Sequence, residues 1–185
     1  MHVVTLVGPE STGKTTLAAR LAAAFGAELS AESARGYAEA RAAAGDPRPL
    51  GPDDVEPIAH GQIALEDAAI ERARAQGHAR VVRDTDLVST VVYARHSYGA
   101  CPSWIEAEAR ARRAGLYLLC DVDVPWAADA ARDPGAADSA VRLAVRDAFV
   151  ETLGEFGCAY AWVRGGWRKR EWVAREAVRA LLGAA

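Results

Sequence analysis

The sequence predicts an α/β fold in which a mostly parallel sheet is covered by helices on both faces. Three observations lead to this prediction. Short β-type runs alternate with Ala-, Glu- and Arg-rich helical stretches, and this alternation requires crossover connections between parallel strands. A glycine-rich loop joins the first run to the first helix. The 185 residues, 51% of them hydrophobic, suffice for one core, so residues 1–185 are expected to form a single domain.

Five strands are predicted from short runs of apolar and β-branched residues. The first run ends directly at a glycine, and the second is the weakest because it is only a few residues long. The predicted strands cover residues 2–7, 28–31, 79–83, 116–121 and 159–164.

Six helices are predicted between and after these strands. They consist largely of alanine, leucine, glutamate and arginine, which have high helix propensity. Proline and glycine punctuate them: the segment 45–54 is a Pro/Gly loop with an acidic start to the next helix, and 132–139 is a second break. The predicted helices cover residues 14–25, 33–44, 53–76, 103–113, 138–156 and 169–182.

Charge and hydropathy exclude several classes of protein. The net charge of −3 does not fit the broad basic face of a general nucleic-acid binder. No apolar run approaches the roughly 18 residues of a membrane span, and the first apolar run is too short for a signal peptide. We therefore expect a cytoplasmic protein. Cys101, Cys120 and Cys158 are odd in number and far apart, which favours neither a disulfide framework nor a zinc site.

The segment GPESTGKT, from Gly8 to Thr15, matches the pattern G-x-x-x-x-G-K-[ST]. Its glycines permit a tight turn that points backbone N–H groups at an anion, and the following helix adds its positive N-terminal end. Lys14 can reach the β and γ phosphates, and the Thr15 hydroxyl is placed to bind Mg²⁺. We therefore predict a nucleoside triphosphate site. Its residues are Gly8, Glu10, Ser11, Thr12, Gly13, Lys14, Thr15 and Thr16.

Such a site also requires a carboxylate at the end of a neighbouring strand. The segment ARVVRDTD supplies Asp84 at the end of a predicted strand and Asp86 two residues later. Asp84 is the better candidate for Mg²⁺, and Asp86 would point the same way if the strand continued. For Asp86 the alternative is a helix N-cap before Leu87, because aspartate is a preferred cap.

The phosphate loop occurs in GTPase switches, ATPase motors and small-molecule kinases. The base-reading NKxD pattern of GTPases is absent, and no glutamine or sensor arginine in a recognisable motif marks an oligomeric ATPase. A kinase requires a carboxylate base for the acceptor hydroxyl and arginines that neutralise the transferring phosphoryl group. Candidates for both are present, which favours a kinase. A regulatory, nucleotide-sensing ATPase that acts through a protein partner remains the alternative.

Glu32 is the first candidate base. It lies where the second strand should end, with Arg35 one turn along the following helix. Ligand sites of open α/β sheets lie at the carboxyl ends of the strands, so Glu32 would face the phosphate site. The alternative is a solvated glutamate at a helix start.

Residues 123–136 are typical of a lid. Pro125 and Pro134 bracket a short piece that carries Asp129 and Arg132. Closing a lid excludes water, which prevents wasteful hydrolysis of ATP. For Arg132 the alternative is an ordinary solvated loop arginine.

Several of these segments together resemble the ribosylnicotinamide kinase domain of the bacterial NadR family. The resemblance covers residues 3 to about 178, and the DTD segment and the pattern PW-x-x-D-x-x-RD are its most specific parts. The segments are GPESTGKTTL, AESARGYAEAR, DTDLVSTVVYARHSYG, LLCDVDVPWAADAARD and VRGGWRKREWVAREAV.

The resemblance implies a P-loop kinase fold with a five-stranded parallel sheet in the order 2-3-1-4-5. It implies that ATP and Mg²⁺ are used to phosphorylate the 5′-hydroxyl of nicotinamide riboside, giving nicotinamide mononucleotide for NAD synthesis. Larger members carry an adenylyltransferase domain, and sometimes a DNA-binding domain, ahead of the kinase. Neither is expected here, because the sequence begins at the first strand. Another nucleoside or small alcohol remains open as the acceptor, and so do GTP as donor and the oligomeric state.

The resemblance also implies roles for single residues. The residues from Gly8 to Thr15 would hold the ATP phosphates, Asp84 would lie near Mg²⁺, and Arg132 would be the lid arginine. Either Glu32 or Asp84 would be the base. The catalytic candidates are Lys14, Glu32, Asp84 and Arg132, and the Mg²⁺ candidates are Thr15 and Asp84.

The adenine and riboside contacts are implied more loosely. Trp167 or Arg170 would border the adenine, with a simple surface turn as the alternative. A positive pyridinium favours aromatic faces and acidic neighbours, although ordinary packing also explains buried aromatics. The substrate candidates are Glu32, Arg35, Asp86, Tyr98, Trp104, Trp126 and Asp129.

Overall fold

The computed structural model describes residues 1–126 and 138–184. In this part of the chain five strands form one sheet, and every neighbouring pair is parallel. The strand order is β2-β3-β1-β4-β5, so the predicted fold class and strand order are confirmed. The strands are β1 (His2–Val7), β2 (Glu28–Ser30), β3 (Arg80–Asp84), β4 (Leu116–Cys120) and β5 (Tyr160–Val163).

Helices connect the strands in the described residues. All six predicted helices are present, and their bounds and those of the strands differ from the prediction by at most two residues. The helices are α1 (Lys14–Phe25), α2 (Ser33–Ala43), the 3-10 helix η1 (Pro52–Asp54), α3 (Val55–Ala75), α4 (Leu87–Tyr98), α5 (Ser103–Ala111), α6 (Ser139–Glu155) and α7 (Trp167–Gly183).

Helix α4 is the element that the sequence prediction missed. Its sequence, LVSTVVYARHSY, is rich in β-branched residues, which favour strands when propensity alone decides. In the structure Asp86 caps its first turn, and Val88, Val91 and Val92 are buried against the sheet and the neighbouring helices. Tertiary burial therefore overrides local propensity in this segment.

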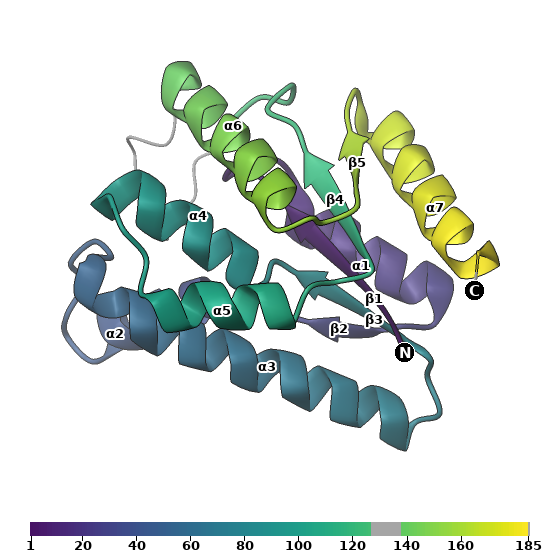
Figure 1. Ribbon diagram of the computed structural model, residues 1–185, viewed down its shortest axis with the longest axis horizontal. Helices are drawn as coiled ribbons and strands as arrows, with labels where there is room; N and C mark the ends of the chain where they lie inside the picture. The colour runs from purple at the N-terminus through teal and green to yellow at the C-terminus, as the bar shows by residue number, and fades with distance from the viewer. Residues whose placement is uncertain (127–137, 185) are drawn as a thin grey trace.

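Helices lie on both faces of the sheet (Figure 1), and the hydrophobic core forms one layer on each face. Successive residues of a strand point to opposite faces, so Val7 and Leu119 enter one layer while Leu6 and Leu118 enter the other. Helices α4, α5 and α6 cover the first layer, and α1 and α7 cover the second. Burial of apolar surface on both faces stabilises the sheet.

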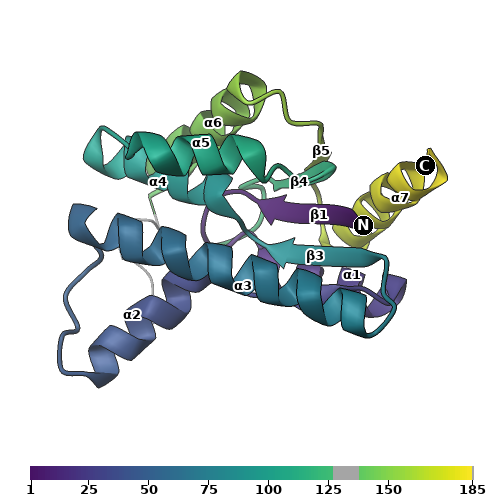
Figure 2. The same ribbon diagram turned by 60° about the horizontal axis from the view of Figure 1, so that its bottom comes forward.

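The N-terminus and the end of α7 lie at the amino ends of the strands, whereas α2 lies beyond their carboxyl ends (Figure 2). Because all strands are parallel, the loops that follow β1, β2, β3 and β4 meet at one edge of the sheet. Ligand sites of open α/β sheets occur at this edge. The fold therefore brings the phosphate loop close to the residues predicted around the acceptor.

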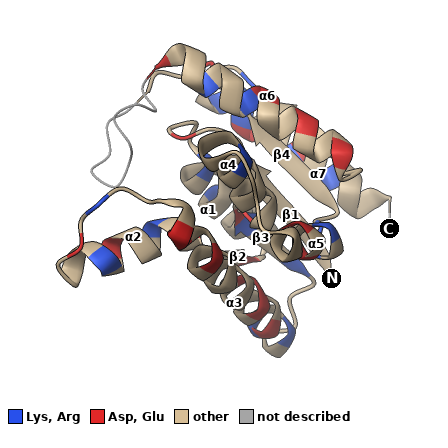
Figure 3. Cartoon of the chain, turned by 60° about the vertical axis from the view of Figure 1, so that its left-hand side comes forward, with Lys and Arg blue, Asp and Glu red and all other residues tan. Residues whose placement is uncertain are grey.

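Along α3 the acidic residues precede the arginines of the last turn, whereas along α6 the arginines precede the acidic residues (Figure 3). None of the helices in the described part of the chain combines the length and the hydropathy that a membrane span requires.

The loop between α2 and α3 is held by one buried carboxylate, Asp54. Its oxygens accept hydrogen bonds from the Tyr37 hydroxyl at 2.9 Å, from Arg41 at 2.8 Å, from Arg48 at 2.9 Å and from the Gly51 N–H at 2.8 Å. Although burial opposes the charged form, these hydrogen bonds hold the pKa of Asp54 well below its usual range. These hydrogen bonds thus hold the Pro/Gly loop between α2 and α3 against α2 and the start of α3.

We expect Asp54→Asn to lower the free energy of unfolding at pH 7 by about 2 kcal/mol, because hydrogen bonds to a charged group are lost. A carboxylate with a depressed folded-state pKa contributes its stability above the unfolded pKa, near 3.8, and loses it as the pH falls further. The difference in the free energy of unfolding between the variant and the wild type should therefore be largest near pH 7 and should shrink below about pH 4. Denaturant unfolding across this pH range measures it.

Asp46→Asn is the matched control for this prediction. Asp46 pairs with the same two arginines at 3.1 and 3.2 Å, but its side chain is 46% exposed. Exposed ion pairs contribute little, so this variant should unfold almost as the wild type does. Equal losses in both variants would contradict the role of Asp54.

Candidate functional site

Two glycines allow the phosphate loop to pack closely against its surroundings. Gly8 has φ +134°, and a Cβ there would collide with the carbonyl oxygen of Cys120. Gly13 has φ +81°, and a Cβ there would lie 2.5 Å from the Trp167 ring. Ser11 also has a positive φ, of 58°. These conformations are costly for most L-residues, which explains the spacing of the two glycines in the motif.

The loop passes directly into α1, whose N-cap Gly13 offers no side-chain cap. The first N–H groups of the helix are therefore open to an anion. Lys14 Nζ donates to the carbonyl oxygens of Gly8 and Pro9, both at 2.9 Å, so its ammonium group lies over the loop. Thr15 and Thr16 are exposed on the first turn of α1. This arrangement can hold a chain of phosphates.

Arg170 supports the loop from within the protein. Only 1% of it is exposed, and its guanidinium donates to the carbonyl oxygens of Thr12 and Asp121, both at 3.0 Å, and to the Asp123 carboxylate. Its N–H groups thus bind both the phosphate loop and the segment that follows β4. Of the two residues predicted to border the adenine, Trp167 is the accessible one, with 46% exposure.

Asp84 ends β3 beside the phosphate loop. It is 4% exposed, and its Oδ1 has no hydrogen-bond partner among the described residues. Asp84 and Lys14 both lie close enough to Cys120 to affect its thiol, whose pKa burial raises to about 11. A buried, unpartnered carboxylate oxygen near a phosphate loop fits one ligand of Mg²⁺, which takes few protein ligands besides phosphates and water. The described residues contain no cluster of three or more histidine, cysteine, aspartate or glutamate side chains that could hold a metal ion.

Asp86 does not continue the strand. The chain turns at Thr85, which has φ +73°, and Asp86 accepts hydrogen bonds from Val88 N at 2.9 Å and from the Tyr117 hydroxyl at 2.8 Å. The N-cap interpretation of Asp86 is therefore the one that the structure shows. Burial raises the pKa of Asp86, and the nearby Arg83 opposes this rise.

Beside the phosphate loop lies a cleft of about 960 Å³. The size is that of a pocket for a small organic ligand. The cleft begins at Gly8, Pro9 and Lys14 and extends between α2, α4 and α6 toward the loop held by Asp54. The residues predicted around the acceptor that line it are Glu32, Arg35, Asp86 and Tyr98.

Glu32 enters the cleft from the N-cap position of α2, with extended backbone angles. At the other end of the cleft, Tyr98 donates its hydroxyl hydrogen to the Leu50 carbonyl oxygen at 2.9 Å. Tyr98 thereby joins the end of α4 to the loop between α2 and α3.

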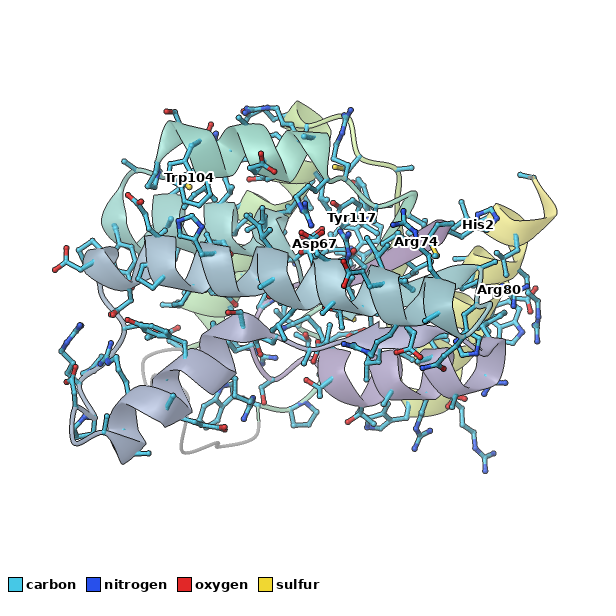
Figure 4. All side chains as sticks on the ribbon, turned by 90° about the horizontal axis from the view of Figure 1, so that it is seen from below. His2, Asp67, Arg74, Arg80, Trp104 and Tyr117 are labelled. Carbon is cyan, nitrogen blue, oxygen red and sulfur yellow. The ribbon has the colours of Figure 1, made fainter. Side chains whose placement is uncertain are left out.

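Two predicted tryptophans are not among the residues that line the cleft, and two predicted lid residues lie outside the described part of the chain. Trp104 is not among the residues that line the cleft; its ring stacks on His60 of α3, with 4.6 Å between the ring centroids (Figure 4). Trp126 is half-buried and also does not line the cleft. Asp129, Arg132 and most of the predicted lid lie outside the described residues. The sequence prediction of a stacking role for Trp104 thus has no support from its position.

Two residues at the cleft were missed from the sequence. Gln62 accepts a hydrogen bond from Ser33 N at 3.0 Å and approaches the Thr85 carbonyl oxygen, linking α3 to the start of α2 and to the turn after β3. Arg142 reaches the cleft from α6. Neither belongs to a local motif, so only the packing of separate helices reveals them.

A buried cluster of charged side chains lies next to Gln62, one of the residues that line the cleft. Glu66 is fully buried and pairs with Arg83 at 3.2 Å and Arg112 at 3.4 Å. Burial raises the pKa of Glu66 to about 7, although Arg83 favours its charged form. Gln62 donates to Glu66 at 3.3 Å, so this group supports one wall of the cleft.

Comparison with known proteins identifies relatives over most of the chain. The family model described as an AAA domain matches residues 3–170. The trifunctional NAD biosynthesis/regulator protein NadR of Salmonella typhimurium is 29% identical over 164 residues, which are 89% of this chain and 38% of that protein. NadR of Escherichia coli is 30% identical over 155 residues, 84% of this chain and 36% of that protein. The chain thus spans less than two fifths of these curated relatives.

Solved structures agree with this relationship. A crystal structure of NadR in complex with NAD and AMP-PNP has a TM-score of 0.77 at 28% identity, covering 98% of this chain and 49% of the other. A structure of NadR in complex with NR has a TM-score of 0.73 at 27% identity, covering 98% and 51%. Thymidylate kinase from Ehrlichia chaffeensis has a TM-score of 0.67 at 18% identity, covering 97% and 98%, and shares the fold. The predicted resemblance to NadR is confirmed.

Proposed function

This chain belongs to the AAA domain family, and we propose that it is a Mg-ATP-dependent kinase that phosphorylates the 5′-hydroxyl of nicotinamide riboside. The product would be nicotinamide mononucleotide, which serves NAD synthesis in the cytoplasm. The observation that carries the proposal is the cleft, which begins at the phosphate loop and leaves room for an acceptor directly beside it. The NadR relatives, one of them crystallised with NR and one with AMP-PNP, support both substrates.

On the donor side, the N–H groups of the loop and of the first turn of α1 would bind the phosphates, and Lys14 would turn from the loop carbonyls toward them. Asp84 and Thr15 would hold Mg²⁺, which supplies neutralising charge when bound. Arg132 is proposed as the lid arginine. Since little covalent chemistry is required of the protein, positioning and charge are its main contributions.

On the acceptor side, we assign the base to Glu32 rather than Asp84. Glu32 lines the cleft where an acceptor hydroxyl would lie, whereas Asp84 is buried at the end of β3 and does not line it. Glu32 would accept the proton of the 5′-hydroxyl. Tyr98 and Asp86, which line the same cleft, would face the positively charged pyridinium.

The test is ADP release by the purified protein with Mg-ATP, alone and with nicotinamide riboside, followed by mass detection of the product. Strong stimulation with formation of nicotinamide mononucleotide is the expected result. ATP binding without stimulation would reject this acceptor and direct the search to other nucleosides. ATP hydrolysis that depends on an added protein and never on an acceptor would instead favour a regulatory ATPase.

We expect Trp167→Ala to raise the KM for ATP about tenfold with little change in turnover, because the stacking of a base on an aromatic ring is worth a few kcal/mol at most. Trp167 is accessible and lies against Gly13 of the loop. Trp172→Ala is the matched control, since Trp172 is a more exposed tryptophan on the same helix, at 63%. An unchanged KM in the Trp167 variant would remove this residue from the adenine site.

A further inference from the structure

Arg142, the fourth residue of α6, is a buried cation that lines the cleft. It is 8% exposed. Both terminal nitrogens donate to a single acceptor, the carbonyl oxygen of Val124, at 3.3 Å, and Nε has no partner among the described residues. Burial lowers the pKa of Arg142, and no carboxylate in the described part of the chain opposes this effect.

The other buried arginines of the described chain are differently placed. Arg83 pairs with Glu66 at 3.2 Å, and Arg170 pairs with Asp123. A buried charge without a counter-ion is costly, so natural proteins supply such charges with partners. Among the described residues Arg142 thus has no anionic partner, and it lines the cavity in which a ligand would lie.

Arg142 lines the same cleft as Gly8, Pro9 and Lys14 of the phosphate loop. Val124 follows Cys120 by four residues, a span of at most about 14 Å, and the carbonyl oxygen of Cys120 lies against Gly8. One turn further along α6, Val145 packs in the same core layer as Val7, the residue before Gly8.

The chemistry of the proposed substrates indicates which anionic group Arg142 would bind. The pyridinium of the riboside is a cation, which an unpaired guanidinium would repel, whereas a phosphoryl group offers the oxygens that a guanidinium binds best. We infer that Arg142 is a further catalytic residue, which binds the phosphoryl group during transfer and then the 5′-phosphate of the product. This inference rests on the proposed kinase function.

Arg142 forms and breaks no covalent bond in this step. The 5′-oxygen bonds to the γ-phosphorus while the bond from that phosphorus to the β–γ bridging oxygen breaks. The electron pair leaves with ADP, and Glu32 takes the hydroxyl proton. The guanidinium binds oxygens on the transferring group and stabilises their charge, as cationic side chains do in phosphoryl transfer.

The test uses Arg142→Met, which retains the apolar stem and removes the charge. The probes are Mg-ADP alone and Mg-ADP with aluminium fluoride, which imitates the transferring phosphoryl group. Affinity for the aluminium fluoride complex should fall about 100-fold, while affinity for Mg-ADP changes little. The thermal midpoint should rise, because an uncompensated buried charge is removed. A purely structural arginine would show the reverse pattern, a lower midpoint with unchanged affinities.

Arg146→Met is the matched control. Arg146 lies one turn further along α6, pairs with Asp147 at 2.6 Å and does not line the cleft, so both affinities should remain those of the wild type. If Arg142→Met does not fold, the same titrations are made with Arg142→Gln. Wild-type affinity for the aluminium fluoride complex in a folded Arg142 variant would overturn the inference.

This test of Arg142 can fail or succeed independently of the proposed function. The aluminium fluoride titration contains no acceptor, and water occupies the acceptor position. Loss of affinity in Arg142→Met together with no product from nicotinamide riboside would reject the acceptor and retain Arg142. Product formation together with an unchanged titration and unchanged turnover would retain the acceptor and reject Arg142.

Discussion

Lys14→Ala is expected to lower phosphoryl transfer about 1,000-fold, because one preorganised charge at the reacting group contributes on this scale. Lys14 is fixed at the start of α1, and its ammonium group lies over the loop through bonds to Gly8 and Pro9. Alanine preserves the helix, since it has the highest helix propensity. Turnover of the purified variant with saturating Mg-ATP measures the effect.

The only other lysine of the sequence, Lys169, provides the control. It is exposed on α7 and does not line the cleft. Lys169→Ala should therefore keep wild-type turnover. If Lys14→Ala retained more than about a tenth of the wild-type rate, the loop would not be acting as the phosphate site of a kinase.

Glu32→Gln is expected to lower turnover about 100- to 10,000-fold, the usual contribution of a general base. Affinity for ATP should stay close to that of the wild type, because Glu32, at the N-cap of α2, lines the part of the cleft that we propose to hold the acceptor. Glutamine keeps the size of the side chain and removes the proton acceptor. Steady-state kinetics, with the concentrations of ATP and acceptor varied separately, separates the effect on turnover from the effect on ATP affinity.

Two further variants test whether Glu32 or Asp84 is the general base. Glu56→Gln is the matched control, since Glu56 is an exposed glutamate in the first turn of α3 and does not line the cleft. Asp84→Asn should raise the Mg²⁺ concentration needed for half-maximal turnover, because Asp84 is proposed to hold the ion. Normal turnover in Glu32→Gln, combined with a loss in Asp84→Asn that excess Mg²⁺ does not restore, would move the base to Asp84.

The parts of the fold that the sequence predicted are those with local signals. The strands of the sheet are short apolar runs bounded by polar residues, and most helices contain strong helix formers. Helix α4 was missed since its β-branched residues favour a strand locally, and only the burial of Val88 and Val91 between sheet and helices stabilises the helix.

At the site, the same distinction separates the phosphate loop from the cleft. The loop is a continuous motif whose glycines and lysine have fixed spacing, so its residues were predictable by number. Asp86 was ambiguous because the same residue type suits a strand end and a helix cap, and the turn at Thr85 decided for the cap. A stacking role for Trp104 was proposed from its chemistry, with ordinary packing as the alternative, and in the structure its ring packs on His60.

The sequence by itself determined the α/β class, the phosphate loop with Lys14, and the strand-end position of Asp84, because each depends on residues close together in the chain. Only the tertiary structure decided which distant side chains share the cleft. Glu32 precedes α2, Tyr98 ends α4 and Arg142 lies in α6, so their meeting at the cleft depends on how those helices pack on the sheet. The burial of Arg142 without a carboxylate partner among the described residues is likewise a property of packing, which no local pattern encodes.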